Sequence, residues 1–301
     1  MEFYKKIIKS KTTRRKIIHA LRFIPDKPML KFQYRLKTGR RLNLKNPQRY
    51  TEKLQWYKAY YRDPVMQQCA DKYRVRQYVE SKGLGDTLND LYAVFDSPED
   101  ITFENLPKEF VLKLSNGSGT NMLVEDRDAL DLEAVRQKFK DFCAESGASV
   151  AREWVYTSTE KPVIIAERYL KDPAKADGSL RDYKIFCFAG KPAYTICVDG
   201  RNTDNYCHVV YDTEWVKQDV IIQGSSAAAD YEKPAELPRM MEIAGILSED
   251  FPFARVDLYF VEGKIYFGEI TYFPWSGYKK FEPDSFDFDL GERFILPEKN
   301  V

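Results

Sequence analysis

An alternating pattern over residues 254–271 constrains the fold of this chain more than any other stretch. Apolar residues such as Val256 and Leu258 alternate with polar or aromatic ones, and Ile270 belongs to a second alternating run. Alternation with a period of two predicts β-strands with one apolar and one polar face. Residues 261–263, Val-Glu-Gly, separate the two runs. We therefore predict a β-hairpin with a three-residue loop and glycine in the left-handed position.

The length of that loop decides which side chains share a face. A three-residue loop places Asp257 and Glu269 on the same face, whereas a two-residue loop would separate them and send Ile270 away from the apolar face. The apolar pattern therefore favours the register in which the two carboxylates lie side by side. Tyr259 and Phe267 are expected on the same polar face.

Paired carboxylates on a rigid sheet are a common way for proteins to hold Mg²⁺ for phosphate chemistry. Arg255 and Thr271 flank the pair. The alternative is a surface hairpin with two solvated acids, which is the usual interpretation of a single acid on a strand. The pairing and its flanking residues weaken this alternative without excluding it.

Composition bounds the class of protein. The 301 residues are 44% hydrophobic and 31% charged, which is ordinary for a globular protein with two or three subdomains. The net charge of +1 argues against nucleic-acid binding. Five widely spaced cysteines without a Cys-x-x-Cys pair indicate free thiols in a reducing cytoplasm. Because Cys207 and His208 are adjacent on a predicted strand, they point to opposite faces, which argues against a zinc site.

The N-terminus is basic and carries no secretory signal or membrane span. Residues 1–22 hold eight Lys and Arg residues against Glu2 alone, with isoleucines interleaved. This pattern is typical of a basic amphipathic helix that contacts the inner face of a membrane peripherally. The alternative is a solvated first helix that packs on the body of the protein.

The remaining pattern is that of an α+β protein without regular β-α-β alternation. Residues 1–68 are predicted to be mainly helical, with a helix over 52–61 capped by Thr51 and a second helix over 71–82. Further helices are predicted over 132–144 and 238–248. Strands are predicted over 91–95, 110–115, 121–125, 162–170, 182–188, 192–198 and 209–211.

A lysine and a glycine-rich loop end one of these strands. Lys113 lies on the polar side of residues 110–115, and Asn-Gly-Ser-Gly follows at 116–119. The lysine supplies a positive charge, and glycines let backbone N–H groups close over phosphate oxygens. No Gly-Lys-Ser/Thr follows, so this is not a P-loop. Taken alone, the segment favours a hairpin turn beside an edge lysine over a phosphate clamp.

Three other positions suit a nucleotide. Lys72 stands at a predicted helix start, where anions are favoured, although such a lysine is most often a surface residue. Residues 167–170 end an apolar strand and can offer backbone groups to a flat base. Asp182 and Lys184 share one strand face and suit a ribose hydroxyl and a phosphate, with a cross-strand ion pair as the alternative.

Taken in order, these features resemble an ATP-grasp enzyme, and more closely the TupA-like ATP-grasp family found in bacterial surface-polysaccharide gene clusters. The resemblance covers roughly residues 40–297, and the ordered co-occurrence is more specific than any single motif. The matching stretches are 46–56, 70–73, 111–119, 165–170, 181–186, 211–215, 251–258 and 268–271.

The resemblance implies an α+β ATP-grasp fold with two α+β subdomains that clamp ATP. The implied division is a mainly helical segment over 1–68, a first subdomain with a glycine-loop lid over 69–165, and a second with the metal-binding hairpin over 166–301.

The resemblance also implies roles for individual residues. The implied ATP-binding residues are Lys72, Lys113, Asn116, Gly117, Ser118, Gly119, Glu167, Arg168, Leu170 and Asp182. The implied Mg²⁺ ligands are Asp257 and Glu269, with Thr271 where many ATP-grasp enzymes have asparagine. Arg255 and Lys184, and also Arg201, would neutralise the transferred phosphate.

The activity implied is an ATP- and Mg²⁺-dependent ligase that activates a carboxylate as an acyl phosphate and joins it to an amine in cell-surface polysaccharide biosynthesis. The implied substrates are a sugar or uronic acid and an amine or amino acid. Two alternatives stay open: a sugar kinase on the same fold, and a glycosyltransferase or accessory role in polysaccharide assembly.

Overall fold

The structure is a computed structural model of the chain. It describes residues 21–117, 119–145, 151–157, 160–173, 175, 177–199, 206–225 and 230–301. The predicted basic helix over 1–22 therefore lies almost entirely outside the described residues, as do Ser118 and Arg201.

The described chain contains helices and antiparallel strands in the order that the sequence predicts. The helices are α3 (Asp26–Thr38), α4 (Tyr50–Tyr60), α5 (Pro64–Ala70), α6 (Val75–Ser81), α7 (Leu132–Glu145), α8 (Leu237–Ser248) and α9 (Ser285–Arg293). The strands are β1 (Leu91–Phe95), β2 (Phe110–Leu114), β3 (Asn121–Val124), β4 (Ile164–Glu167), β5 (Asp182–Phe188), β6 (Lys191–Asp199), β7 (Cys207–Asp212), β8 (Ile221–Ile222), β9 (Ala254–Val261), β10 (Lys264–Thr271) and β11 (Phe281–Glu282). Short 3₁₀ turns are η1 (Leu21–Phe23), η2 (Gly85–Thr87), η3 (Pro98–Asp100), η4 (Arg127–Ala129), η5 (Trp154–Tyr156) and η6 (Pro274–Gly277).

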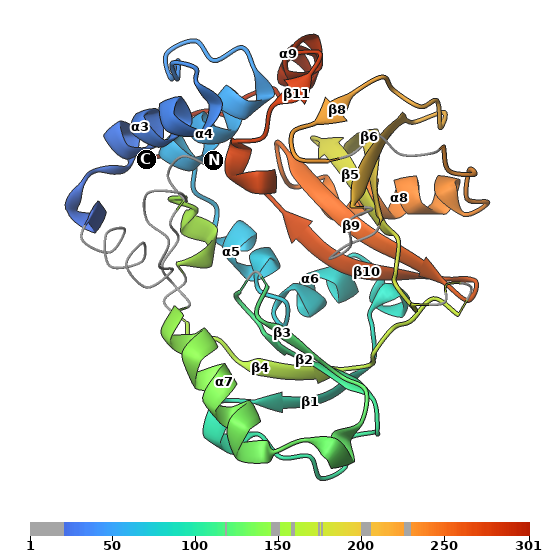
Figure 1. Ribbon diagram of the computed structural model, residues 1–301. Coiled ribbons are helices and arrows are strands. Elements are labelled where there is room, and N and C mark those ends of the chain that lie inside the picture. The colour runs from blue at the N-terminus through green and yellow to red at the C-terminus, as the bar shows by residue number, and fades with distance from the viewer. Residues whose placement is uncertain are drawn as a thin grey trace.

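The first sheet has the strand order β1-β4-β2-β3 and lies at the bottom of Figure 1. Phe110, Leu112 and Leu114 of β2 are fully buried and pack with Phe139 of α7 in one hydrophobic cluster. The expected alternation of β2 is therefore confirmed. Because β2 lies between β4 and β3, Lys113 is on an inner strand, and its interpretation as an edge lysine is wrong.

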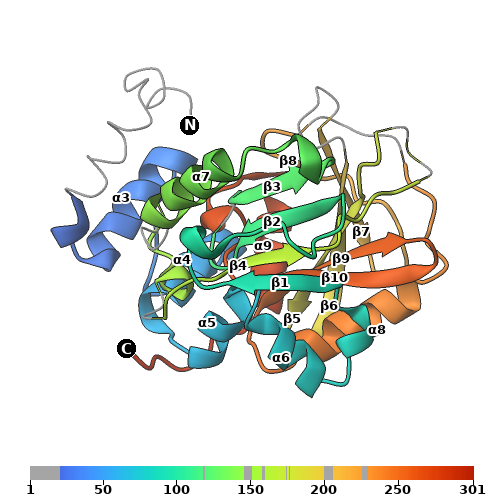
Figure 2. The same ribbon diagram turned by 90° about the horizontal axis from the view of Figure 1, so that it is seen from below.

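The second sheet has the order β10-β9-β5-β6-β7, and α8 packs on one of its faces. Figure 1 shows the two sheets as separate layers, and in Figure 2, seen from below, the first sheet lies in front of part of the second. In Figure 1, α5 and α6 lie between them. The Sγ of Cys187 on β5 donates to the carbonyl oxygen of Ala244 on α8, so this face belongs to the core. The polar residues of β5, β9 and β10 point to the opposite face.

The N-terminal helices share a core with the second sheet. Tyr50 and Tyr57 of α4 belong to the same cluster as Phe186 of β5 and Phe294 after α9. The predicted capping role of Thr51 is wrong, because α4 begins at Tyr50 and follows Arg49. Thr51 instead donates from its backbone N–H and its hydroxyl to the buried Asp287 of α9, at 3.0 and 2.8 Å.

The second predicted helix also begins later than expected. The carboxylate of Asp71 accepts from the backbone N–H groups of Tyr73 and Arg74, at 2.9 and 3.0 Å, and so closes a turn before Val75. The hydroxyl of Ser115 donates to the other oxygen of Asp71 at 2.6 Å. The start of α6 is therefore tied to the end of β2.

The β9–β10 hairpin reaches the expected register by a different route. Its loop has two residues, Glu262 and Gly263, both with positive φ, so the three-residue loop was wrong. A register shift between Phe267 and Glu269 then adds one residue to β10. This bulge at Gly268 brings Glu269 opposite Asp257, as predicted.

The bulge also reverses one expected side-chain direction. Before it, Phe267 pairs with Leu258 and joins the hydrophobic core, so its predicted place on the polar face is wrong. Gly268 itself has no room for a side chain, because a Cβ there would lie 2.9 Å from Cε2 of Tyr259 and 3.0 Å from the carbonyl oxygen of Asp257. Tyr259 packs over the bulge and makes glycine necessary at this position.

Candidate active site

Three neighbouring strands place a row of charged side chains on the polar face of the second sheet. Lys184 of β5 pairs with Asp257 of β9, and Asp257 pairs with Glu269 of β10. Arg255 and Thr271 form the next row on the hairpin. The sheet therefore brings together five of the six residues that the sequence assigned to the metal and to the transferred phosphate, and the sixth, Arg201, lies outside the described residues.

Arg255 links the acids of this row. Its Nε and Nη2 donate to the two carboxylate oxygens of Asp257 at 2.6 and 2.7 Å. The same Nη2 lies 3.0 Å from Oε1 of Glu269 and 3.0 Å from the hydroxyl oxygen of Thr271. The ammonium of Lys184 contacts Asp257 as well. The Nη2 nitrogen of Arg255 thus lies at the point where oxygen atoms of three side chains converge.

That convergence fits a divalent cation. Carboxylate and hydroxyl oxygens are the ligands that Mg²⁺ prefers, and they surround the Arg255 guanidinium here as they would surround a metal ion. Within the described residues no group of three His, Cys, Asp or Glu side chains gathers around one point. A magnesium ion at Asp257, Glu269 and Thr271 would therefore need further oxygens from phosphates or water, which is usual for this ion.

Burial and neighbouring charges act in opposite directions on the two acids. Burial raises the pKa of Asp257 against the attraction of Arg255 and Lys184. Burial also acts to raise the pKa of Glu269, but Arg255, Lys184 and Lys72 outweigh it and lower that pKa to about 2. With this lowered pKa, the Glu269 carboxylate is ionised at neutral pH. Its side chain is 47% exposed and therefore open to solvent.

Lys72 and the glycine-rich segment lie on the opposite side of the site. The ammonium of Lys72 donates to the carbonyl oxygen of Gly117, and its backbone N–H donates to Ser115 at 2.8 Å. Burial lowers the pKa of Lys72. A Cβ at Gly117 would collide with the Thr120 side chain at 2.1 Å, so the tight path of the loop requires glycine there. Asn116 and Gly119 flank this turn and lie outside the pocket described below.

The other predicted nucleotide residues gather near the ends of β2 and β4. The ammonium of Lys113 lies 2.7 Å from Oε2 of Glu167, and Nη1 of Arg76 lies 3.5 Å from the other oxygen. The backbone N–H of Arg168 donates to Asp90, and its Nη1 donates to the Tyr266 hydroxyl at 3.3 Å.

Leu170 and Asp182 lie on either side of the connection between the two sheets. Leu170 follows β4 and is half-buried. Asp182 begins β5 and is buried, with Oδ2 at 3.6 Å from the ammonium of Lys184.

A pocket of about 690 Å³ lies between the sheets, and only part of the predicted site lines it. The predicted residues that line it are Lys72, Gly117, Lys184, Arg255, Glu269 and Thr271. These are the residues assigned to phosphate and metal. The residues assigned to adenine and ribose do not line this pocket. Its remaining volume therefore lies beyond the phosphate end of the proposed nucleotide site.

A second group of pocket-lining residues, here called the far wall, has a different character, and the sequence considered only His208 among them. It is formed by Tyr156, Tyr206, His208 and Trp275, with Glu153. Tyr206 and His208 share a hydrogen bond of 2.9 Å between the hydroxyl and Nε2. The His208 and Trp275 rings meet edge to face, with centroids 5.6 Å apart. Their scattered positions gave no motif that a reading of the sequence alone could use.

A buried lysine supports this wall. Lys58 of α4 is fully buried, and its Nζ donates to the carbonyl oxygens of Ala151 and Ser276 at 3.1 and 2.9 Å. The backbone at Trp275 and Ser276 is left-handed, with φ of 48° and 58°. Left-handed non-glycine residues are strained and persist only when their surroundings fix them. Lys58 provides part of that support.

The chain belongs to the TupA-like ATP-grasp family, whose sequence profile matches residues 52–295. Its fold is accordingly the α+β ATP-grasp fold, as predicted. No protein of curated function matches the chain.

Several solved structures are similar to parts of this chain. A D-alanine–D-alanine ligase from Bacillus anthracis complexed with ATP is 18% identical, with a TM-score of 0.42 over 75% of this chain and 63% of that protein. An L-amino acid ligase from Bacillus licheniformis is 18% identical, with a TM-score of 0.45 over 72% of this chain and 46% of that one. The D-cycloserine synthetase DcsG is 16% identical, with a TM-score of 0.44 over 77% and 72%. This chain thus spans less than two thirds of the first two proteins.

Proposed function

We propose that the protein is an ATP- and Mg²⁺-dependent ligase that joins a carboxylate to an amine. The observation that carries the proposal is the arrangement of one pocket. Lys72, Lys184 and Arg255 line the same pocket as Glu269, and the aromatic residues of the far wall line it as well. Such a pocket suits a reaction in which a phosphoryl group meets a second, non-nucleotide substrate. Membership of an ATP-grasp family supports ATP as the phosphoryl donor.

The proposed reaction has two steps. A carboxylate oxygen of the first substrate attacks the γ-phosphorus of ATP, and the bond to the ADP oxygen breaks. The amine nitrogen of the second substrate then attacks the carbonyl carbon of the acyl phosphate. Inorganic phosphate leaves, the nitrogen loses a proton, and an amide remains. Both steps concentrate negative charge on phosphate oxygens, so fixed positive charges stabilise their transition states.

The residues present supply those charges. Lys72 and Lys113 would bind the ATP phosphates, with residues 116–119 closing over them. Arg255 and Lys184 would neutralise the transferred phosphoryl group once they are released from Asp257. Asp257, Glu269 and Thr271 would hold Mg²⁺, which supplies Lewis-acid polarisation of the phosphate oxygens. Glu167, Arg168 and Leu170 would surround adenine, and Asp182 would bind the ribose.

We also propose a class of substrate for each of the two steps. We assign the first substrate to a carboxylate, either a uronic acid of a cell-surface polysaccharide or an amino acid, and the second to an amine, which includes the amino group of a sugar or amino acid. The aromatic far wall suits a ring-bearing substrate, because aromatic side chains bind the apolar faces of rings. The place of action is proposed to be the cytoplasm, with peripheral membrane contact through residues 1–22. No helix among the described residues has the length and hydrophobicity needed to cross a bilayer.

The ligase is tested by trapping the acyl phosphate. The protein is incubated with Mg-ATP, glucuronate and hydroxylamine, and hydroxamate is measured by its iron complex. Hydroxamate that requires both ATP and the carboxylate supports the ligase. A stable phosphorylated sugar without hydroxamate would support the kinase instead and would overturn the ligase.

The metal site has its own test, which needs no identified acceptor. Binding of Mg-ATP is measured calorimetrically for Asp257→Asn and Glu269→Gln, with the exposed acids Asp86→Asn and Glu104→Gln as matched controls. We expect at least tenfold weaker binding for the first pair and no change for the second. Absence of ATP binding by the unaltered protein would favour the accessory role in polysaccharide assembly.

A further inference from the structure

Charge is strongly separated along this chain. Residues 1–48 contain fifteen Lys and Arg residues, whereas Glu2 and Asp26 are their only acids. This segment therefore carries a net charge of +13, although the whole chain carries only +1. The remaining residues are correspondingly acidic. A cationic region of this density attracts polyanionic surfaces over about a Debye length.

The described part of this region exposes large apolar side chains. Phe32 and Leu36 of α3 are 61% and 53% exposed, and Phe23 of η1 is 81% exposed. Phe23 is the most exposed large hydrophobic residue in the described chain. Phe32 and Leu36 are four residues apart on a helix, so they project from the same side. The opposite side of α3 buries Leu30 and Tyr34 in the core.

Basic residues share the exposed side of α3. Lys31 and Arg35 are exposed and directly precede Phe32 and Leu36. Among the described residues, neither of them forms an ion pair with a carboxylate. Asp26, the single acid of residues 21–48, is occupied by Arg152 at 3.1 Å. The exposed side of α3 therefore combines bulky apolar groups with cations and has no acid.

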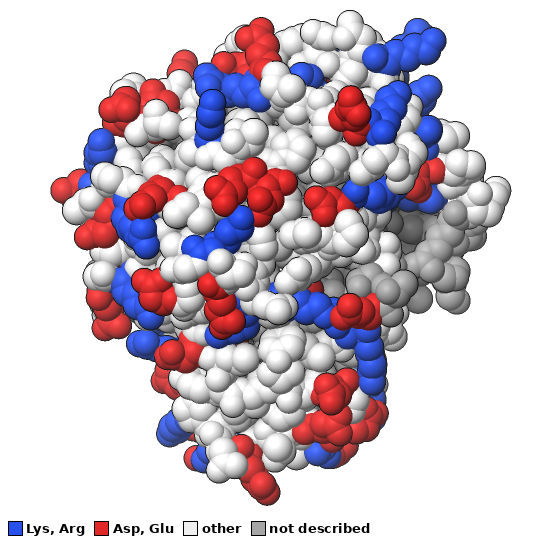
Figure 3. All heavy atoms as spheres, turned by 180° about the vertical axis from the view of Figure 1, so that it is seen from behind, with Lys and Arg blue, Asp and Glu red and all other residues white. Residues whose placement is uncertain are grey.

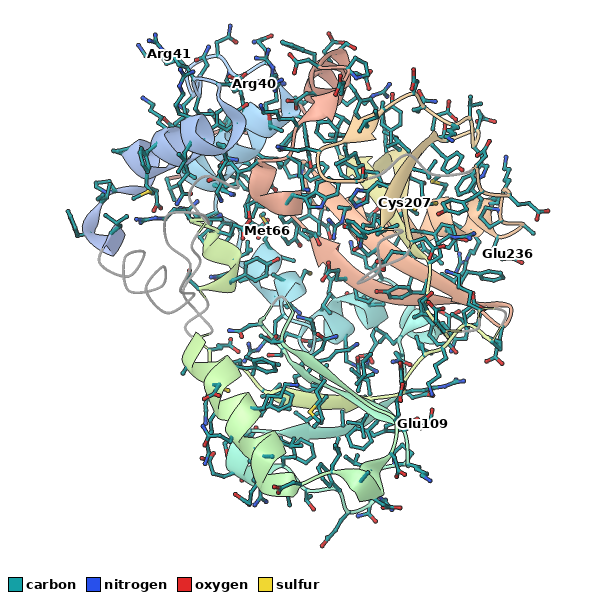
Figure 4. The ribbon with its side chains drawn as sticks, in the orientation of Figure 1. Arg40, Arg41, Met66, Glu109, Cys207 and Glu236 are labelled. Carbon is teal, nitrogen blue, oxygen red and sulfur yellow. The ribbon has the colours of Figure 1, made fainter. Side chains whose placement is uncertain are left out.

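The basic character continues beyond the helix. Figure 4 shows Arg40 and Arg41 at the outer edge of the molecule, in the loop after α3. Arg40 is bound to Asp284 at 2.6 Å, whereas Arg41 is exposed. Seen from behind in Figure 3, Lys and Arg side chains also gather at the upper right of the molecule.

We infer that η1 and α3 form a docking surface for an anionic lipid bilayer. This α3 surface consists of Phe23, Lys31, Phe32, Arg35 and Leu36. Helices that lie in the membrane interface bury aromatic and aliphatic groups at the boundary of the acyl chains and place Lys and Arg beside the anionic headgroups. The α3 surface has both parts, and the net charge of residues 1–48 supplies the long-range attraction. The inference does not depend on the proposed ligase activity.

Vesicle co-sedimentation of the full-length protein tests the surface. Vesicles of phosphatidylcholine alone are compared with vesicles that also contain phosphatidylglycerol. The unaltered protein is expected to bind only the anionic vesicles, and added salt is expected to weaken binding. Lys31→Glu with Arg35→Glu should weaken binding by about tenfold or more, and Phe32→Ser with Leu36→Ser should weaken it by a similar factor.

The matched control is Leu123→Ser with Val216→Ser, two residues elsewhere on the molecule that are 53% and 57% exposed. It should bind vesicles like the unaltered protein. Equal binding to neutral and anionic vesicles would overturn the inference. So would unchanged binding of the Phe32→Ser/Leu36→Ser variant, which would leave residues 1–20 as the membrane contact. A dimer in size-exclusion chromatography that the same variant converts to a monomer would assign the surface to a second copy of the chain.

Discussion

The buried ammonium of Lys58 donates a hydrogen bond to the carbonyl oxygen of Ser276 at 2.9 Å. Through this bond, α4 fixes the left-handed segment that carries Trp275 into the pocket. Lys58 also binds the carbonyl oxygen of Ala151, two residues before Glu153, which lines the same pocket. One side chain from the N-terminal helices therefore contacts both the segment that carries Trp275 and the segment that carries Glu153.

Replacing Lys58 should affect the carboxylate substrate more than ATP. We expect Lys58→Met to raise the KM for the carboxylate in hydroxamate formation by about tenfold, because the loss of buried hydrogen bonds costs about 1–3 kcal/mol. The KM for ATP should stay within about twofold, because Lys58 does not reach the phosphate end of the pocket. Lys37→Met is the control, since Lys37 lies over the Tyr278 ring, at 4.0 Å from its centroid, on the same side of the core. Equal rises in both KM values would argue against a role at the far wall.

The same lysine makes a prediction for stability against pH. Burial lowers the pKa of Lys58 to about 8, below its ordinary value of 10.5. Below pH 8 the ammonium is charged in both states, so the folded protein bears its full desolvation cost. As pH rises from 8 to 10.5, the folded state releases the proton first, so the free energy of unfolding gains a contribution of about 3 kcal/mol.

This contribution is measured by urea unfolding of the unaltered protein and of Lys58→Met at several pH values in that interval. The free energy of unfolding of the unaltered protein minus that of Lys58→Met should increase as pH rises. Because Met cannot titrate, other groups cancel in the difference. A difference that does not change with pH would contradict the desolvation of Lys58.

The bulge at Gly268 should be essential to the proposed Mg²⁺ site. Gly268→Ala would place a Cβ against Tyr259 and the carbonyl oxygen of Asp257, at 2.9 and 3.0 Å. We expect a loss of about 1–3 kcal/mol in the free energy of unfolding, and weaker Mg-ATP binding because Glu269 moves relative to Asp257. Gly85→Ala is the control, because its Cβ would meet only Glu80 at 3.5 Å. Undiminished stability and Mg-ATP binding in Gly268→Ala would show that the register does not need the bulge.

A substitution at Lys113 tests the proposed nucleotide site without altering the proposed Mg²⁺ ligands. We expect Lys113→Met to weaken ATP binding by about tenfold or more, through loss of a charge-assisted contact to phosphate. Lys108→Met, just before β2, is the control and should bind ATP normally, because its side chain is 66% exposed and lies beside Asp126. ATP titrations followed by calorimetry distinguish the two variants. Normal ATP binding by Lys113→Met would leave Lys113 as a structural partner of Glu167 alone.

The sequence predicted most of the fold because its local signals agree. Period-two alternation identified β2, β5 and the β9–β10 hairpin, and helical spacing identified α7 and α8. It failed where a side chain from a distant segment intervened. Thr51 has the sequence context of a helix cap, but it donates hydrogen bonds to Asp287 from within the first turn of α4. The division of the chain at residues 68 and 165 stays a prediction.

The candidate site divides in the same way. By itself the sequence determined which charged residues share the polar face of the hairpin, because apolar alternation along the strands fixes which side chains point to the core, and their roles at the phosphate end stay a prediction. Only the tertiary structure decided how Glu269 comes opposite Asp257, since a bulge against Tyr259 makes up for a shorter loop. It alone also formed the far wall, because packing around the buried Lys58 joins residues that no local pattern connects.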